Sequence, residues 1–237
     1  APFAVNQIAH PSNKRLLADM EVCVQEEVPL IITSLNPPRE IVQAVHSYGG
    51  LVFHDVISLR HTRKAIEQGV DGIIAVCAGA GGHAGSLSPF ALIGEIRKEF
   101  DGCLIVSGCI SRGDDVLAAR AMGADLAYSG TRFIATEEAR ALPSYKEMIV
   151  ESAAKDIVYS SLFTGIHGNY LGGSITKAGM DPANLPDGSK TDMDFSKVRE
   201  LDAQVWKDIW GAGEGVGTLE EVLPGRGGLL RMVQDSG

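Results

Sequence analysis

The sequence is poor in aromatic and basic residues, and it contains no long apolar run. Aromatic residues are 6% of the 237, and 21 Lys and Arg against 30 Asp and Glu give a formal net charge of −9. Such a charge argues against general binding to nucleic acid or to an anionic membrane surface. No apolar run reaches the roughly 18 residues that a bilayer-spanning helix needs. We therefore expect a cytoplasmic protein whose partners are small molecules, not nucleic acids or membranes.

The sequence also lacks the cysteine motifs of metal sites and redox centres. Cys23, Cys77, Cys103 and Cys109 form no C-x-x-C pair, and no His follows them at zinc-finger spacing. We expect reduced and mostly buried thiols, and no metal site. The N-terminal segment also lacks a basic stretch followed by an apolar one, so it does not resemble a signal peptide.

Glycine is abundant, and it punctuates a regular alternation of apolar runs and helix-period segments. There are 28 glycines in the chain, above the typical share of about 7%. Apolar runs of four or five residues are typical of parallel strands buried on both faces. Strands are predicted at 3–6, 29–33, 51–54, 72–76, 104–107 and 126–129, with helices at 12–26, 38–48, 59–69, 88–100, 112–122 and from 133. Six consecutive βα units indicate a (β/α)8 barrel or an open doubly wound sheet.

The alternation stops near residue 140. Residues 143–180 are predicted to be helical with a glycine-containing break, and 181–197 to form a loop. A helix over 195–210, a turn over 211–217 and a last helix over about 218–234 complete the chain. The predicted organisation is a set of barrel units over 1–140 and a helical cap over 141–237, packed on the same domain.

The loop AGAGGHAG, residues 78–85, is the most informative segment. It follows a predicted strand and precedes a helix, and its four glycines let the backbone approach a planar or anionic ligand closely. His83 lies near its centre, and an imidazole that titrates near neutrality suits proton transfer. A glycine-rich turn with an incidental surface His is the alternative.

Two further strands end in Ser-Gly, at Ser107-Gly108 and at Ser129-Gly130-Thr131. Backbone N–H groups there, together with the helix that follows, can form an anion cradle. Paired glycine loops after two successive late strands match the phosphate site of (β/α)8 barrels. Small residues at tight strand-to-helix turns are the alternative. No G-x-G-x-x-G follows the first strand, which argues against a Rossmann dinucleotide site.

AGGHAG, LIVSGCI and GADLAYSGTRF together resemble the nitronate monooxygenases, which are FMN-dependent (β/α)8 barrels. SYKEMIV, DIVYSSLFTGIHGNYL and WKDIWGAGEGVG resemble the cap of that family, so the resemblance extends from Phe3 to about Val216. It implies that His83 is the active-site acid or base, which removes the α-proton of a nitroalkane or holds the nitro or nitronate group. It also implies an FMN-phosphate site at Ser107, Gly108, Ser129, Gly130 and Thr131, flavin contacts at Asn6 and Gly82, and pocket contacts from the cap at Lys207 and Trp210.

The activity implied by the resemblance is FMN-dependent oxidative denitrification of alkyl nitronates or nitroalkanes by O2, which gives a carbonyl compound and nitrite. A flavin-dependent NAD(P)H reductase of the enoyl-thioester type is the alternative enzyme. A truncated, non-catalytic fragment that binds FMN or phosphate is the non-enzymatic alternative. A homo-oligomer is a further expectation.

Three departures from the family pattern stand out. Cys109 occupies a position where a second glycine is common, and Glu214 one where Gln is common. The family barrel begins with a QAPM-x-G strand, whereas six units are visible here and a barrel has eight. Because a six-strand sheet exposes two edges, we expect two further units upstream of Phe3.

Several other side chains carry open alternatives. His54, at the end of a predicted strand beside Asp55, either lines the pocket or is a hydrogen-bonded structural residue. His167, in the predicted cap, either contacts substrate or caps a kinked helix. Trp206 and Trp210 share a helical face and serve either packing or stacking on a ligand.

Overall fold

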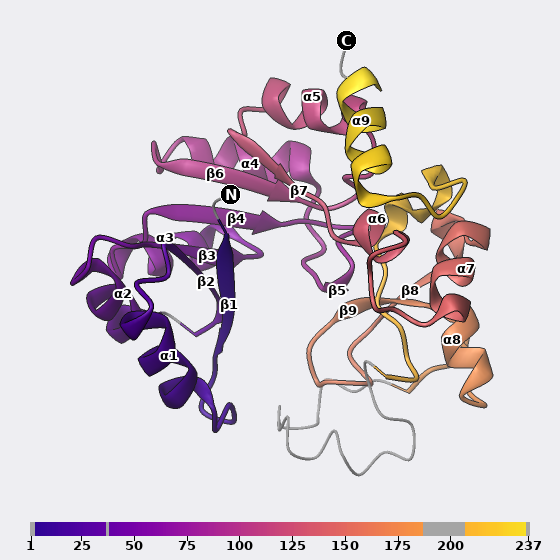
Figure 1. Ribbon diagram of the computed structural model, residues 1–237, viewed down its shortest axis with the longest axis horizontal. Helices are drawn as coiled ribbons and strands as arrows, with labels where there is room; N and C mark the ends of the chain where they lie inside the picture. Colours follow the sequence, from indigo (N-terminus) through magenta and orange to yellow (C-terminus); the bar gives the residue numbers. More distant parts are fainter. Residues whose placement is uncertain (1–2, 37, 187–206, 236–237) are drawn as a thin grey trace.

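The computed structural model describes residues 3–36, 38–186 and 207–235 (Figure 1). Its main sheet has six parallel strands in the order β1-β2-β3-β4-β6-β7, with β1 and β7 at the edges. The strands are β1 (Ala4–Ala9), β2 (Leu30–Leu35), β3 (Leu51–Val56), β4 (Gly72–Val76), β6 (Cys103–Ser107) and β7 (Leu126–Tyr128). The sequential order has no reversal point, so the doubly wound alternative is excluded and the fold is an α/β TIM barrel.

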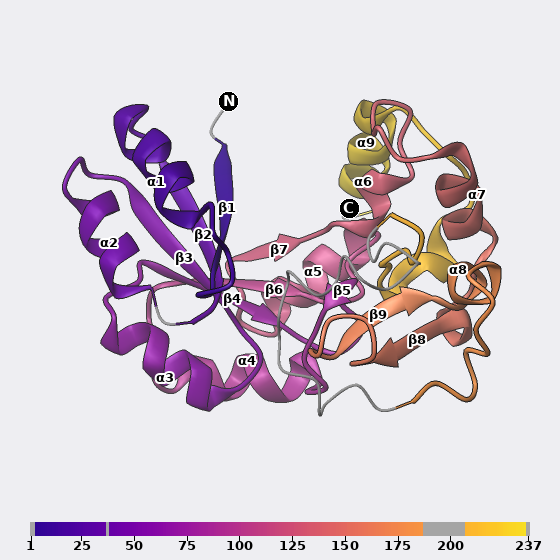
Figure 2. The same cartoon turned by 90° about the horizontal axis from the view of Figure 1, so that it is seen from below.

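Helices cover one face of this sheet (Figures 1 and 2). They are α1 (Leu16–Gln25), α2 (Arg39–His46), α3 (Leu59–Glu67), α4 (Pro89–Arg97) and α5 (Gly113–Ala121). Ile31, Val52 and Ile73 are fully buried and pack against these helices in the largest apolar cluster. Alternate strand residues form a separate cluster on the other face, which includes Phe53 and Ile74. The inner strands β2, β3, β4 and β6 are therefore buried on both faces, as their apolar runs predict, whereas the edge strands β1 and β7 keep exposed residues.

All six predicted strands of the main sheet are confirmed, and the predicted helices between them shift only at their ends. The largest shift is at α1, which begins at Leu16 and not at residue 12. Asn13 accounts for the late start, because its side chain donates to Ile8 O at 3.1 Å and accepts from Arg15 N at 3.2 Å. An Asn that bonds its own backbone favours a turn over a helix.

The helical prediction for 143–180 is wrong in its middle. α7 (Pro143–Glu151) and a short 3-10 turn, η1 (Ala154–Asp156), are followed by two strands, β8 (Ile157–Ser160) and β9 (Gly168–Leu171), and then by α8 (Gly172–Lys177). β8 and β9 pair antiparallel, and the two-residue β5 (Gly82–His83) joins the free side of β9. The glycines that suggested a helix break instead shape the hairpin, since Gly165 has φ +76°.

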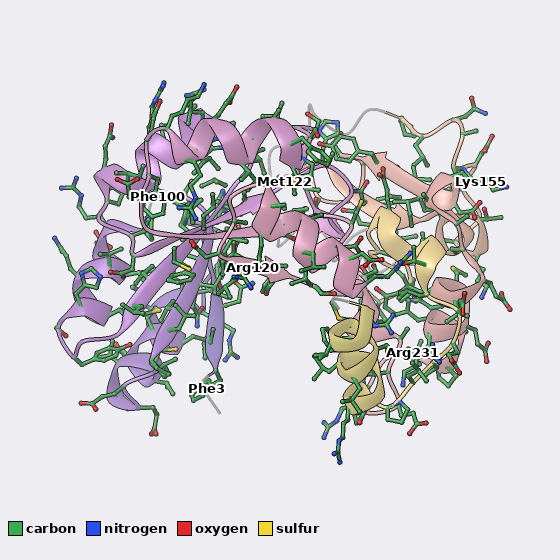
Figure 3. The ribbon with its side chains drawn as sticks, turned by 90° about the horizontal axis from the view of Figure 1, so that it is seen from above. Phe3, Phe100, Arg120, Met122, Lys155 and Arg231 are labelled. Atoms are coloured by element: carbon green, nitrogen blue, oxygen red, sulfur yellow. The ribbon has the colours of Figure 1, made fainter. Side chains whose placement is uncertain are left out.

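The C-terminal prediction is only partly confirmed. Residues 195–206 of the predicted helix, including Trp206, lie outside the described residues, and 207–210 are turn and extended backbone. The predicted turn contains a 3-10 helix, η3 (Glu214–Thr218), and the last helix, α9 (Gly225–Asp235), begins after Pro224. α9 packs beside α5 and α6 (Thr131–Ile134) (Figure 3, where Arg120 and Arg231 are labelled). Within the described ranges, no helix is long and apolar enough to cross a membrane.

Candidate active site

A cavity of about 310 Å³ lies at the carboxyl ends of β4, β6 and β7. Five stretches of chain supply its walls, and the last of them comes from the region after residue 210. The lining residues are Gly79, Ala80, Gly81, Gly82, Ser107, Gly108, Cys109, Ile110, Ser111, Tyr128, Gly130, Thr131, Ile134, Tyr145, Gly211, Gly213 and Gly215. Every one of these side chains is uncharged or, as in Tyr and Cys, ordinarily neutral near pH 7.

The loop after β4 meets the 211–215 segment backbone to backbone. Glu214 N donates to Gly79 O at 2.9 Å, and the side-chain amide of buried Asn169 donates to Ala80 O at 2.7 Å. A Cβ added at Gly213 would lie 2.5 Å from Gly79 O, closer than real Cβ atoms come. The close contact of the two segments therefore requires glycine at this position.

The two Ser-Gly loops reach the cavity, but not with every predicted side chain. Ser107, Gly108, Gly130 and Thr131 line it. Gly108 has φ +133°, and a Cβ there would lie 2.7 Å from Ala78 O. Ser129 faces elsewhere, because its hydroxyl donates to Ile110 O at 2.7 Å and ties the two loops together.

The start of α5 contributes less to anion binding than expected. Asp115 accepts hydrogen bonds from Ser111 N and from Arg112 N, both at 2.8 Å. These two donors are therefore satisfied within the protein. The other expected contributor, α6, has only four residues. An anion in the cavity would depend on loop N–H groups and hydroxyls.

These walls fit a flavin phosphate. At Gly130 an added Cβ would meet nothing within 4 Å, so this position opens onto free space at the end of β7. The hydroxyls of Ser107, Ser111 and Thr131 line the same cavity and can donate hydrogen bonds to phosphate oxygens. Among the lining residues that the structure describes, none has an acidic side chain that would repel a phosphate dianion, although Glu214 Oε2 lies close to Gly79.

His83, the predicted acid or base, lies on β5 one residue beyond the lining residue Gly82. Its ring is partly buried, and burial lowers the pKa of its imidazole. The ring is therefore neutral near pH 7, which is the form of a general base. Its Nε2 lies 2.8 Å from the Thr164 hydroxyl.

Four predicted contacts do not line the cavity. Asn6 is an exposed residue in the middle of β1, and Lys207 is exposed. His167 is exposed, and its ring stacks on Tyr159 with centroids 4.9 Å apart. Trp210 is 7% exposed and stacks on Tyr145 at 4.9 Å, so it supports a lining residue from behind.

His54 takes the structural alternative. It is 3% exposed, and its Nδ1 lies 2.8 Å from the Thr33 hydroxyl. Burial lowers its pKa to about 4, so it stays neutral inside the fold. Its neighbours Val52 and Val56 on the same face of β3 belong to the helix-covered cluster, away from the cavity.

Sequence reasoning placed Asp55 beside His54 at this edge of the sheet without giving it a role, and it missed Tyr128 and Tyr145 as residues of the site. Asp55 shares the inner face of β3 with Phe53, and burial raises the pKa of its carboxyl to about 7. Burial and the Asp55 carboxylate together raise the pKa of Tyr128, which lines the cavity. Tyr145 donates a short hydrogen bond to Gly211 O. The alternation of side chains along β3 could have shown that Asp55 lies on the inner face of the sheet, on the same side as Phe53.

The two unusual residues of the family pattern lie at one corner of the site. Cys109 has φ +57°, a conformation that side chains other than glycine rarely adopt. Burial, and then the Glu214 carboxylate, raise the pKa of its thiol. The raised pKa keeps the thiol protonated near pH 7, although Cys109 itself is exposed.

Residues 4–183 match the family model described as nitronate monooxygenase. A nitronate monooxygenase of Paraburkholderia phytofirmans is 28% identical over 66% of this chain and 46% of its own length. A Rhodococcus jostii dehydrogenase named for a carboxyl-CoA compound is 23% identical over 88% of this chain and 58% of its own length. The chain thus spans about half the length of these relatives.

Two solved structures share the fold over 99% of this chain. FabK from Thermotoga maritima matches with a TM-score of 0.80 at 24% identity, over 76% of its own chain. Nitroalkane oxidase from Streptomyces ansochromogenes matches with a TM-score of 0.81 at 20% identity, over 80% of its own chain. At these identities the likeness establishes the fold alone.

Proposed function

The chain belongs to the nitronate monooxygenase family, a family of flavoproteins, and we propose that it binds FMN and oxidises alkyl nitronates or nitroalkanes with O2. The observation that carries the proposal is the glycine-walled cavity with a neutral His83 one residue from its wall. Residues 107–108 and 130–131 would hold the FMN phosphate. Bound FMN would supply the electron transfer between substrate and O2.

The proposed reaction balances without a further reductant. Two alkyl nitronates and one O2 give two carbonyl compounds and two nitrite ions. In each substrate the C–N bond breaks, a C–O bond forms, and nitrite leaves with the nitrogen. O2 is the oxidant, and one of its atoms appears in each carbonyl product.

His83 acts as a base only when the substrate is a neutral nitroalkane. Its unprotonated ring nitrogen would take the α-proton, and the C–H electron pair would become the C=N bond of the nitronate. The lowered pKa keeps the imidazole in the basic form at pH 7. A positioned base of this kind contributes about 10²–10⁴-fold to rate.

The test compares the two substrate forms in His83→Asn. Turnover of a neutral nitroalkane should fall about 10²-fold or more, because the base is lost. Turnover of the pre-formed nitronate should stay within a few fold, and FMN should stay bound by its visible spectrum. His46→Asn is the matched control, because His46 is exposed on the outer face of α2 and its side chain bonds to Asp71. Equal turnover of neutral nitroalkane by wild type and His83→Asn would remove His83 from the mechanism.

The reductase alternative is tested by anaerobic mixing with NADH and with NADPH. Under the proposed function, neither nucleotide bleaches the flavin rapidly, and the nitronate does. Rapid bleaching by a nicotinamide together with no nitrite release from nitronates would overturn the proposal. Cytoplasmic location and homo-oligomer formation stay predictions of the sequence.

A further inference from the structure

Two polar side chains, those of Tyr128 and Asp55, point to the inner face of the main sheet. Tyr128 pairs with Ser107 across β7 and β6, and both residues line the cavity. Tyr128 is 45% exposed and Asp55 is partly exposed, so a ligand can reach both. Among the residues that the structure describes, neither the Tyr128 hydroxyl nor the Asp55 carboxyl makes a hydrogen bond or an ion pair. Unpaired polar groups at such a place are expected to meet a ligand or water.

The alternation of side chains along β3 and β7 fixes the direction of both groups. Ala127 packs against the helix-covered cluster, so its neighbour Tyr128 points to the opposite, inner face. Asp55 is next to Val56 of the same helix-covered cluster, and it therefore points inward with Phe53. The Asp55 carboxylate raises the pKa of Tyr128, so the two groups lie within electrostatic range of each other across the barrel interior.

Both groups can donate a hydrogen bond near pH 7. Burial, and then the Asp55 carboxylate, raise the pKa of the Tyr128 phenol above its ordinary value of 10.0, so the phenol keeps its proton. Burial raises the pKa of Asp55 to about 7, so about half of the molecules carry a neutral carboxylic acid at that pH. A phenol and a neutral carboxylic acid each have one O–H, and such donors bind an anionic oxygen more strongly than a neutral one.

We propose that Tyr128 and Asp55 form the subsite that binds the two oxygens of the substrate's nitronate or nitro group. The proposal rests on the proposed function, to which it adds the residues that hold the reacting group. A nitronate carries its negative charge on these oxygens, and none of the described lining residues is cationic, so hydrogen bonds must hold the anion. The ionised form of Asp55 would repel the anion, so the subsite binds nitronate only while Asp55 is protonated.

The groups around Asp55 leave its carboxyl to titrate near pH 7. The strands β1, β2 and β4 present uncharged residues to the inner face. From β6 comes Cys103, whose thiol stays protonated because burial raises its pKa, and from β7 comes Tyr128. His54 points to the opposite face of β3. Burial lowers the pKa of His83 on β5, so its ring is neutral in the range where Asp55 titrates.

The first test measures binding without turnover, by isothermal titration calorimetry of the full chain with FMN in excess. The probe is isobutyrate, an unreactive anion with two oxygens and two methyl groups, like the nitronate of 2-nitropropane. Excess FMN keeps the proposed phosphate loops occupied. Tyr128→Phe should weaken isobutyrate binding about tenfold or more, because a hydrogen bond to a charged group is lost. Tyr48→Phe is the matched control and should leave the Kd unchanged, since the Tyr48 hydroxyl donates to Val28 O at 2.9 Å and neither residue lines the cavity.

The same titration at pH 6 and pH 8 tests Asp55. In the wild-type protein the Kd of isobutyrate should rise about tenfold between these values, because the protonated fraction of Asp55 falls from about nine-tenths to about one-tenth. In Asp55→Asn, which keeps a donor and cannot ionise, the Kd should stay within about threefold over this range. Asp101→Asn, at an exposed residue, is the matched control and should keep the wild-type rise. His83→Asn should keep it too, which would exclude His83 as its source.

Steady-state kinetics separate substrate binding from a structural role of Tyr128. Tyr128→Phe should raise KM for pre-formed nitronate about tenfold or more and leave kcat within a few fold. KM for the neutral nitroalkane should rise less, since a hydrogen bond to an uncharged oxygen is weaker. A merely structural role would instead weaken FMN binding and lower kcat for both substrates equally, and that result would refute the proposal.

Two results of the calorimetry would also overturn the proposal. One is an unchanged Kd of isobutyrate in Tyr128→Phe, and the other is a wild-type Kd that is the same at pH 6 and pH 8. A different result would refute the proposed function and leave the subsite standing. This is isobutyrate binding that depends on Tyr128 and on pH as expected, in a protein that turns over neither nitronate nor nitroalkane.

Discussion

Replacing Asp55 with asparagine should stabilise the protein, and the gain should grow with pH. Asp55 lies on the inner face of β3, where burial raises the pKa of its carboxyl from 3.8 to about 7. Its folded state binds a proton more tightly than the unfolded chain does. Stability of the wild-type protein therefore falls as the pH rises from about 4 to about 7. Asparagine cannot ionise, so the stability of the variant should not fall over this pH range.

The magnitude follows from the size of the shift. About three units at 1.36 kcal/mol each give a loss of about 4 kcal/mol once the pH exceeds 7. At pH 5 the same reasoning leaves a loss of about 1.5 kcal/mol. The gain from Asp55→Asn should therefore increase by about 2.5 kcal/mol between pH 5 and pH 8. This is a large part of the 5–15 kcal/mol typical of a folded domain, on the order of a quarter.

The assay is urea unfolding of wild type and Asp55→Asn at pH 5, 6.5 and 8, with a common m-value. Asp125→Asn provides a control of opposite sign. A backbone hydrogen bond from Leu104 and a side-chain hydrogen bond from Arg97 lower the pKa of the Asp125 carboxyl, so its loss should destabilise the protein at neutral pH. A pH-independent difference between wild type and Asp55→Asn would refute the reasoning.

Two further changes test the cavity walls. Gly213→Ala should weaken FMN binding at least about tenfold in a fluorescence titration, because the new Cβ would lie 2.5 Å from Gly79 O and must push the two segments apart; unchanged affinity would show that the walls can separate freely. Tyr145→Phe should lower stability by about 1 kcal/mol in urea unfolding, since Gly211 O loses its donor; an unaltered unfolding midpoint would show that water replaces this hydrogen bond.

The main sheet could be predicted because each strand is a compact apolar run between helix-period segments. β2 and β4 can be identified from sequence alone, because burial on both faces makes nearly every residue of the strand apolar. β5, with two residues inside a glycine-rich loop, has no such mark. The hairpin of β8 and β9 was equally hidden, because the glycines that shape it also match a helix break.

Some residues of the site could be predicted from the sequence, and others could not. Gly82, Ser107 and Gly130 lie at or shortly after the ends of β4, β6 and β7, so they could be placed from the chain pattern alone. Thr164 could not, because its contact with His83 exists only after β9 pairs with β5. The family motifs predicted that the His167 and Trp210 side chains contact the pocket. In the fold each of them stacks on a tyrosine instead.

The wall formed by residues 211–215 also determines at which stage of folding the cavity can form. Glu214 N bonds to Gly79 O across 135 positions of sequence, so the cavity wall cannot close until residue 214 has been synthesised. During synthesis the six strands leave the ribosome well before this segment does. Binding of the proposed FMN would then be a late event that reports assembly of this wall. Free flavin at 100 times its Kd would add about 2.7 kcal/mol to the finished state and nothing to its precursors.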